Sequence, residues 1–92
     1  MDVEHFCLLE VDDQLKLALN TEDSKILDVI CKSGCDGPII YAARNKHTDV
    51  ETLDTLARTT KCGRVVESLL FNPNLPLKTR KRLCKKWQKE TF

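Results

Sequence analysis

The sequence predicts an all-α fold, a short helical-repeat (α-α solenoid-like) bundle of about five or six helices. Three observations support this prediction. Apolar residues recur at helical spacing along most of the chain, no stretch shows a sustained two-residue strand period, and breaks marked by asparagine recur at intervals of 25 and 27 residues. Ile39–Tyr41 and Val65–Val66 have strand-like composition, so they are the segments where an all-helical fold would fail.

Three segments near the N-terminus carry helix signals. A first helix, from about Val3 to Glu10, is expected to cap the stack. Asp12 and Asp13 precede the apolar segment 14–19, and a helix dipole favours negative charge at such a position. The apolar stripe from Ile26 to Ile30 leads into a basic last turn and a glycine, which is typical of a helix C-terminus.

The next helix is expected from Pro38 to Arg44, because proline is favoured in a first helical turn. The helix after it has apolar residues at 50, 53, 56 and 57, one stripe of a 3.6-residue period. Thr48 and Glu51 predict a capping box that begins this helix, in which the Thr48 hydroxyl accepts from the N–H of residue 51. Gly63 precedes a further apolar segment that ends at Phe71.

A repeat is predicted because three asparagines, Asn20, Asn45 and Asn72, each close a short apolar segment. After each comes a short polar break and then an amphipathic helix. The second and third copies align without a gap, since Asn45 to Leu56 and Asn72 to Leu83 both span 11 residues. An asparagine side chain can bond to backbone groups that are left free where a helix ends.

The third break, Asn72-Pro73-Asn74-Leu75-Pro76, is the most strongly marked. Pro73 disfavours helical geometry at the residue before it, and Pro76 presets the start of the next helix. The segment LLFNPNLPLKTRKRLCKKW (69–87) resembles the variant leucine-rich repeat, an all-helical repeat in the style of HEAT and armadillo repeats. YAARNKHTDVETLDTLART (41–59) matches the same frame, with Thr48 at the position of Leu75, but it lacks both prolines.

The resemblance covers residues 15–87 and implies three repeat-like units, 15–34, 38–61 and 64–87, behind an N-terminal cap at 1–14 within a single helical domain. It also implies a protein-binding role, because families of this repeat style generally bind proteins. A non-repetitive bundle of four or five helices stays open as the alternative, since asparagine and proline are common in helix–helix connections.

The composition favours one small cytoplasmic domain. The 92 residues are 41% hydrophobic and 32% charged, and no apolar run is long enough to span a membrane. The N-terminus lacks the layout of a signal peptide. The net charge of +1 combines a first part (1–60) with 12 acidic and 6 basic side chains, net −6, and a second part (61–92) with 2 acidic and 9 basic side chains, net +7.

No catalytic or cofactor motif is present, so we expect no enzyme activity and no cofactor. His5 and His47 are the only histidines and lie in no catalytic pattern. Five cysteines exclude a complete intramolecular disulfide framework, and free thiols are the favoured interpretation. The spacing of Cys31 and Cys35, with Cys62 further along, leaves a cysteine-ligated metal site open as an alternative.

The basic C-terminal helix is the candidate partner-binding site. Its candidate residues are Lys78, Arg80, Lys81, Arg82, Lys85, Lys86 and Trp87, and Lys89 extends the same basic run. Trp and Arg are enriched among interface hot spots, so this helix could bind an acidic protein surface. The other interpretations are a solvated terminal cap and a nucleic-acid contact through the lysines.

The function expected from these observations is a non-catalytic protein–protein interaction module, an adaptor or a small inhibitor. It would bind through the concave face of the repeat or through the basic C-terminal helix. The alternatives are a nucleic-acid-binding protein that uses this helix and a cysteine-ligated metal protein. No membrane partner is expected, and a homodimer is compatible with the sequence.

Overall fold

The protein is all-α, as predicted. The computed structural model describes the backbone of residues 1–91 and the side chains of residues 1–87. Within these residues it contains no strand and seven helices: α1 (Val3–Leu8), α2 (Val11–Asn20), α3 (Ser24–Lys32), α4 (Asp36–Arg44), α5 (Val50–Thr59), α6 (Gly63–Phe71) and α7 (Leu77–Thr91). In this described part of the chain, no helix is both long and apolar enough to cross a membrane.

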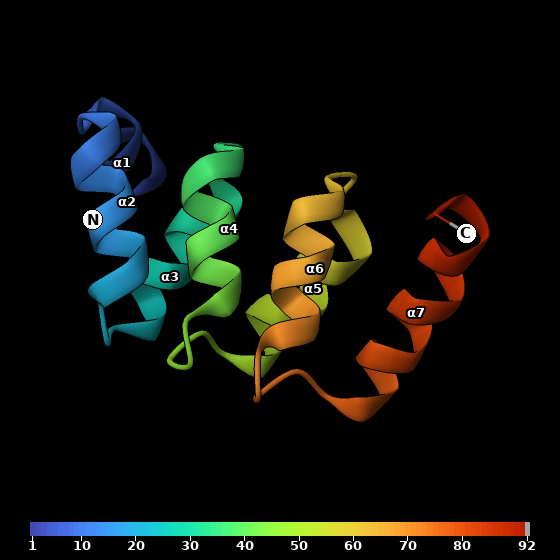
Figure 1. Cartoon of the computed structure of the whole chain (residues 1–92). Coiled ribbons are helices and arrows are strands. Elements are labelled where there is room, and N and C mark those ends of the chain that lie inside the picture. Colours follow the sequence, from blue (N-terminus) through green and yellow to red (C-terminus); the bar gives the residue numbers. More distant parts are fainter. Residues whose placement is uncertain (92) are drawn as a thin grey trace.

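The helices form two adjoining rows along an elongated molecule of 37 × 21 × 17 Å (Figure 1). One row runs α2, α4, α6, and the other runs α1, α3, α5, α7, with each helix packed against the next in its row. Contacts of α3 with α4 and of α5 with α6 join the rows. The N-terminal helices therefore lie at one end of the molecule and α7 at the other (Figure 1).

The core consists of two hydrophobic clusters. The larger lies between α4, α5, α6 and α7, and the smaller contains Phe6 and Leu27 and lies between α1, α2, α3 and α4. Cys31 packs against both clusters. In α5 the predicted apolar stripe buries Leu53, Leu56 and Ala57, whereas Val50 stays exposed in the first turn. The strand-like residues Ile39 and Val65 are buried within helices, so tertiary packing outweighs their β preference.

The number of helices, seven in residues 1–91, exceeds the predicted five or six. Leu9 and Glu10 have extended backbones and separate the short α1 from α2, in agreement with the separate helix signals at 3–10 and 14–19. The expected boundary between the cap and the first unit, at residues 14–15, falls inside α2. The glycine predicted to end the third helix, Gly34, has a left-handed φ of 80° directly after the helix cap at Ser33, as a C-terminal glycine should.

The capping box predicted at Thr48 does not form, and this is a correction. The N-cap residue of α5 is Asp49, one position later, and no side chain caps the helix start. Thr48 is buried and its hydroxyl instead donates to the carbonyl of Ala42 at the end of α4 (2.6 Å). The threonine of this Thr-x-x-Glu pattern therefore binds the end of the preceding helix and does not cap the following one.

The alignment of Asn20 with Asn45 and Asn72 was also wrong by one residue. The C-cap residue of α2 is Thr21, and Asn20 is the exposed last residue of the helix itself. The Thr21 hydroxyl accepts from the N–H of Asp23, two residues on. Asn45 and Asn72 accept through their side-chain oxygens from the residues two positions after them. A threonine thus takes the place of the first asparagine, because both side chains can accept such a local bond.

Candidate protein-docking surface

Two buried asparagines tie successive helices of one row together. The Asn45 amide nitrogen donates to the carbonyls of Ala18 (3.0 Å) and Thr21 (2.9 Å) at the end of α2. The Asn72 amide nitrogen donates to the carbonyls of Ala43 (2.8 Å) and Asn45 (3.0 Å) at the end of α4. Helix ends leave carbonyls without intrahelical partners. Each asparagine therefore supplies a donor to the free carbonyls of the preceding helix in the row.

Arg80 makes the corresponding contact at the end of α6. Its guanidinium donates to the carbonyls of Leu70 (2.6 Å) and Asn72 (3.4 Å). These two acceptors occupy the same positions relative to the helix end as the two acceptors of Asn72. Arg80, predicted as a partner-binding residue, thus lies partly buried with its guanidinium directed to the protein's own backbone.

A second set of contacts joins successive helices of the other row. The Thr52 hydroxyl of α5 donates to Asp28 of α3 (2.9 Å), and the Thr79 hydroxyl of α7 donates to Asp54 of α5 (2.8 Å). Each aspartate also pairs with a basic residue four positions later on its own helix: Asp28 with Lys32 (2.7 Å) and Asp54 with Arg58 (3.3 Å).

These contacts were not predicted from the sequence, although they leave a signal in it. Thr52 and Thr79 are 27 residues apart, and an aspartate followed by a basic residue four positions on occurs at both 28 and 54. Asparagines and prolines draw attention first because they mark breaks. The Thr–Asp contacts lie inside helices, where the sequence does not distinguish a polar residue that contacts another helix from one that faces solvent.

Asp54 is the most heavily engaged carboxylate at the α5–α7 contact. It accepts from Thr79 and pairs with Arg82 of α7 as well as with Arg58. The Thr79 hydrogen bond, with support from the two guanidinium groups, holds the pKa of Asp54 below its ordinary value. Arg82, another predicted partner-binding residue, is exposed but paired inside the chain.

The acid–base pattern changes on α7. A shift of 27 residues places Lys81 where Asp54 stands on α5, and Lys85 where Arg58 stands. Lys81 and Lys85 are exposed. The last helix therefore ends the row with a basic residue at the position that, on α3 and α5, accepts from the following helix.

The uncovered side of α7 is the strongest candidate surface, and we call it the α7 outer face. It consists of residues spaced along one side of the helix, all exposed: Leu77, Lys78, Lys81, Cys84 and Lys85. Lys86 is also exposed, on the flank toward Arg82. No acidic residue occurs in α7 between residues 77 and 87, and no helix of the described chain follows α7 in its row.

Trp87 lies apart from this face. It is partly buried and packs against the larger core cluster, with its ring beside Gly63 of α6. Lys89 falls outside the residues whose side chains the structure describes. Of the seven predicted residues, four lysines are thus exposed, two arginines contact the chain itself, and the tryptophan contributes to the core.

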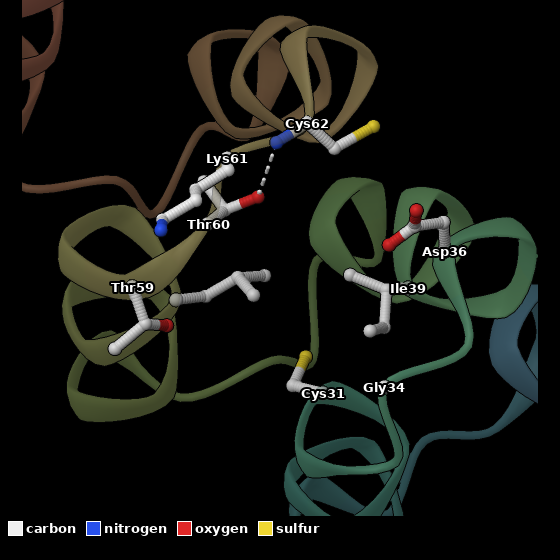
Figure 2. A pocket seen from close by; sticks show the side chains of 9 residues that line it. Cys31, Gly34, Asp36, Ile39, Thr59, Thr60, Lys61 and Cys62 are labelled. Carbon is white, nitrogen blue, oxygen red and sulfur yellow. Dashed lines mark hydrogen bonds between the residues drawn. The ribbon is translucent and has the colours of Figure 1, made fainter.

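A pocket of about 550 Å³ lies between the α3–α4 link and the α5–α6 link (Figure 2). Cys31 and Cys62 line opposite sides of it, and the Cys62 N–H donates to the Thr60 hydroxyl (3.2 Å). Burial raises the pKa of the Cys31 thiol to about 12, so this group stays protonated near neutral pH and is a weak nucleophile. Among the described residues, no three cysteine, histidine or carboxylate side chains are placed to hold a metal ion.

Comparison with known proteins adds no relative, since no family model, curated protein or solved structure matches the chain.

Proposed function

We propose that this chain is a non-catalytic protein-binding module whose partner presents an acidic surface to the α7 outer face. One observation carries the proposal: Lys78, Lys81 and Lys85 lie exposed along the uncovered side of the terminal helix, with no acidic side chain on that helix up to residue 87. Charge of a single sign steers a partner of the opposite sign and aligns the two surfaces.

A protein partner is favoured over nucleic acid by the charges around this face. The Asp54 carboxylate of α5 already pairs with Arg82, another basic residue of α7. The first part of the chain is strongly acidic, and one Trp, one Tyr and three Phe offer few stacking surfaces for bases. A phosphate backbone would be attracted by the lysines of α7 and repelled by the acidic residues elsewhere in the chain. A protein surface can carry charges of both signs and so match this mixed pattern.

As part of the same proposal, the module is a helical repeat in the style of the variant leucine-rich repeat. The backbone contacts of Asn45 recur at Asn72, and the aspartate contact of Thr52 recurs at Thr79. These recurrences support the assignment, since equivalent contacts at a fixed spacing are expected of stacked units. An adaptor or a small inhibitor that acts in the cytoplasm is the role that suits a binding module of this size.

The test is affinity capture from a nuclease-treated extract of the native cells, with three forms of the protein as bait. We expect Lys81→Glu/Lys85→Glu to lose a partner that wild type retains. The matched control, Lys25→Glu/Lys46→Glu, makes the same change in net charge at exposed positions away from α7 and should retain it.

Equal capture by all three baits would contradict the proposal. A shift of a random DNA duplex by wild type at low salt, abolished by the α7 variant, would replace it with the nucleic-acid alternative.

A further inference from the structure

The row α1, α3, α5, α7 has an uncovered face at each of its two ends, because α1 packs only on α3 within the row and α7 only on α5. The charges of these ends are opposite. Residues 1–15 contain no Lys or Arg and five exposed acidic residues: Asp2, Glu4, Glu10, Asp12 and Asp13. Residues 77–87 of α7 contain basic residues and no acidic ones.

Both ends also expose apolar side chains. At the acidic end, Leu8 is 79% exposed and Val11 is 66% exposed. At the basic end, Leu77 is 65% exposed on the α7 outer face. Single exposed apolar residues are common on proteins, but a large one beside matched charges at each end gives a contact that can exclude water.

The contacts inside the row show what α7 lacks. The α3–α5 and α5–α7 joints each bring an aspartate and a basic residue together across or beside the interface: Asp28 with Lys32, and Asp54 with both Arg58 and Arg82. On α7 the corresponding positions hold Lys81 and Lys85, and residues 77–87 of this helix contain no carboxylate side chain. Whatever covers α7 must therefore supply the carboxylates, and the acidic end of this same chain carries them.

We propose that the α7 outer face of one copy docks on the α1–α2 end of a second copy, so that the protein associates head to tail through complementary charges. This inference rests on the proposed function, since it names the partner of the same face. Two unlike surfaces form a heterologous contact, which leaves a free end on every assembly and lets further copies add. A symmetric contact of α7 with α7 would instead place like charges together.

Such a contact is reversible and depends on salt. The charged side chains at both ends are exposed, and salt screens exposed charges over a Debye length of about 10 Å at 0.1 M ionic strength. We therefore expect the weight-average mass to rise with protein concentration at about 50 mM NaCl and to return to the monomer mass of 10.5 kDa at about 500 mM NaCl.

The experiment is light scattering coupled to size-exclusion chromatography, with sedimentation velocity as a second readout. One variant changes the acidic end (Glu4→Lys/Glu10→Lys) and another changes the basic end (Lys81→Glu/Lys85→Glu). Each is expected to stay monomeric at low salt, because the charge complementarity is lost: the first variant changes the side-chain charge of residues 1–15 from −5 to −1, and the second changes that of the α7 outer face from +3 to −1. An equimolar mixture should associate again, since the unchanged α7 outer face of the first variant can bind the unchanged acidic end of the second.

Lys25→Glu/Lys46→Glu is the matched control and should associate like wild type. Circular dichroism and a thermal melt establish that each variant is folded. A wild type that is monomeric at every concentration at low salt would overturn the inference, and so would a mixture that stays monomeric or a dimer that persists at high salt. Affinity capture separates the two proposals: a monomeric protein that still binds another protein through Lys81 and Lys85 refutes self-association alone.

Discussion

The Asn72 side chain joins the end of α6 to the end of α4. It is fully buried, donates to the carbonyls of Ala43 and Asn45, and accepts from the N–H of Asn74. A buried polar group that loses its partner costs far more than the bond itself contributes, because water cannot replace the partner.

We expect Asn72→Ala to lower the free energy of unfolding by about 2 to 3 kcal/mol, since it removes the buried donor to the Ala43 carbonyl and one of the two donors to the Asn45 carbonyl, which keeps the Thr48 N–H. Asn20→Ala is the control, because Asn20 is exposed, and its effect should stay within about 0.5 kcal/mol. Urea unfolding followed by circular dichroism measures both. Similar losses in the two variants would restore the alignment that treats the three asparagines alike.

Arg80 is a second single residue on which the fold depends. Its side chain binds the carbonyls at the end of α6, as Asn45 and Asn72 bind those at the ends of α2 and α4. Arg80→Met keeps most of the aliphatic packing and removes the donors to Leu70 and Asn72. We expect a loss of about 2 kcal/mol, the usual range for hydrogen bonds to a charged group. Lys81→Met, one position along and exposed, should change stability by less than about 0.5 kcal/mol. Equal effects would mean that the Arg80 contacts contribute nothing.

At the scale of helices, the link between α4 and α5 shows how one sequence pattern can serve two structures. Thr48 and Glu51 have the spacing of a capping box, yet the Thr48 hydroxyl binds the end of the preceding helix. We expect Thr48→Val to destabilise the protein by about 1 to 2 kcal/mol, because the Ala42 carbonyl loses a buried donor. Thr48→Ser, which keeps the hydroxyl, should recover part of that loss.

Glu51→Ala distinguishes the two arrangements by the same urea measurement. A capping box would lose the Glu51 carboxylate contact and weaken, whereas the observed link involves an exposed Glu51 and should lose less than about 0.5 kcal/mol.

The α5–α7 joint depends on pH through Asp54. Its pKa in the folded protein lies below the ordinary value of 3.8, so the ionised carboxylate stabilises the fold above that pH. This stabilisation is lost as the pH falls through the lower folded pKa. We expect the stability advantage of wild type over Asp54→Asn to be greatest above about pH 5 and to shrink toward about pH 2.

Urea midpoints at a series of pH values give this comparison. Glu51→Gln, which removes one negative charge from an exposed position of the same helix, should keep the acid dependence of wild type. A parallel decline for wild type and Asp54→Asn would exclude Asp54 as the source.

For the whole molecule, the sequence predicted the class of fold and the positions of most helices, because apolar spacing and proline or glycine punctuation are local signals. Asn45 and Asn72 could be found from their spacing alone. Thr21 could not, since threonine and asparagine perform the same local bonding and only the coordinates show which residue ends α2. Arg80 looked like a surface residue because its acceptors lie eight and ten positions earlier, beyond a break.

Only part of the candidate surface could be predicted from the sequence. A run of basic residues identifies a basic helix, but the helical period decides which members face outward. Lys78, Lys81 and Lys85 fall on the uncovered side, whereas Arg80 and Trp87 turn toward the core. The separation of negative and positive charge along the sequence becomes a separation in space only because the chain progresses from one end of the molecule to the other (Figure 1).

The way in which Arg80 and Lys81 close the two rows also determines how a longer version of this protein could be built. A unit appended after α7 would find the α6 carbonyls already occupied and a lysine where its threonine needs a carboxylate. A second copy of residues 46–72 inserted directly after Asn72 would meet neither obstacle. Its asparagine would reach the α6 carbonyls, its threonine would reach Asp54, and α7 would close the new last unit as before. In the proposed repeat, a unit can therefore be added in the middle but not after α7.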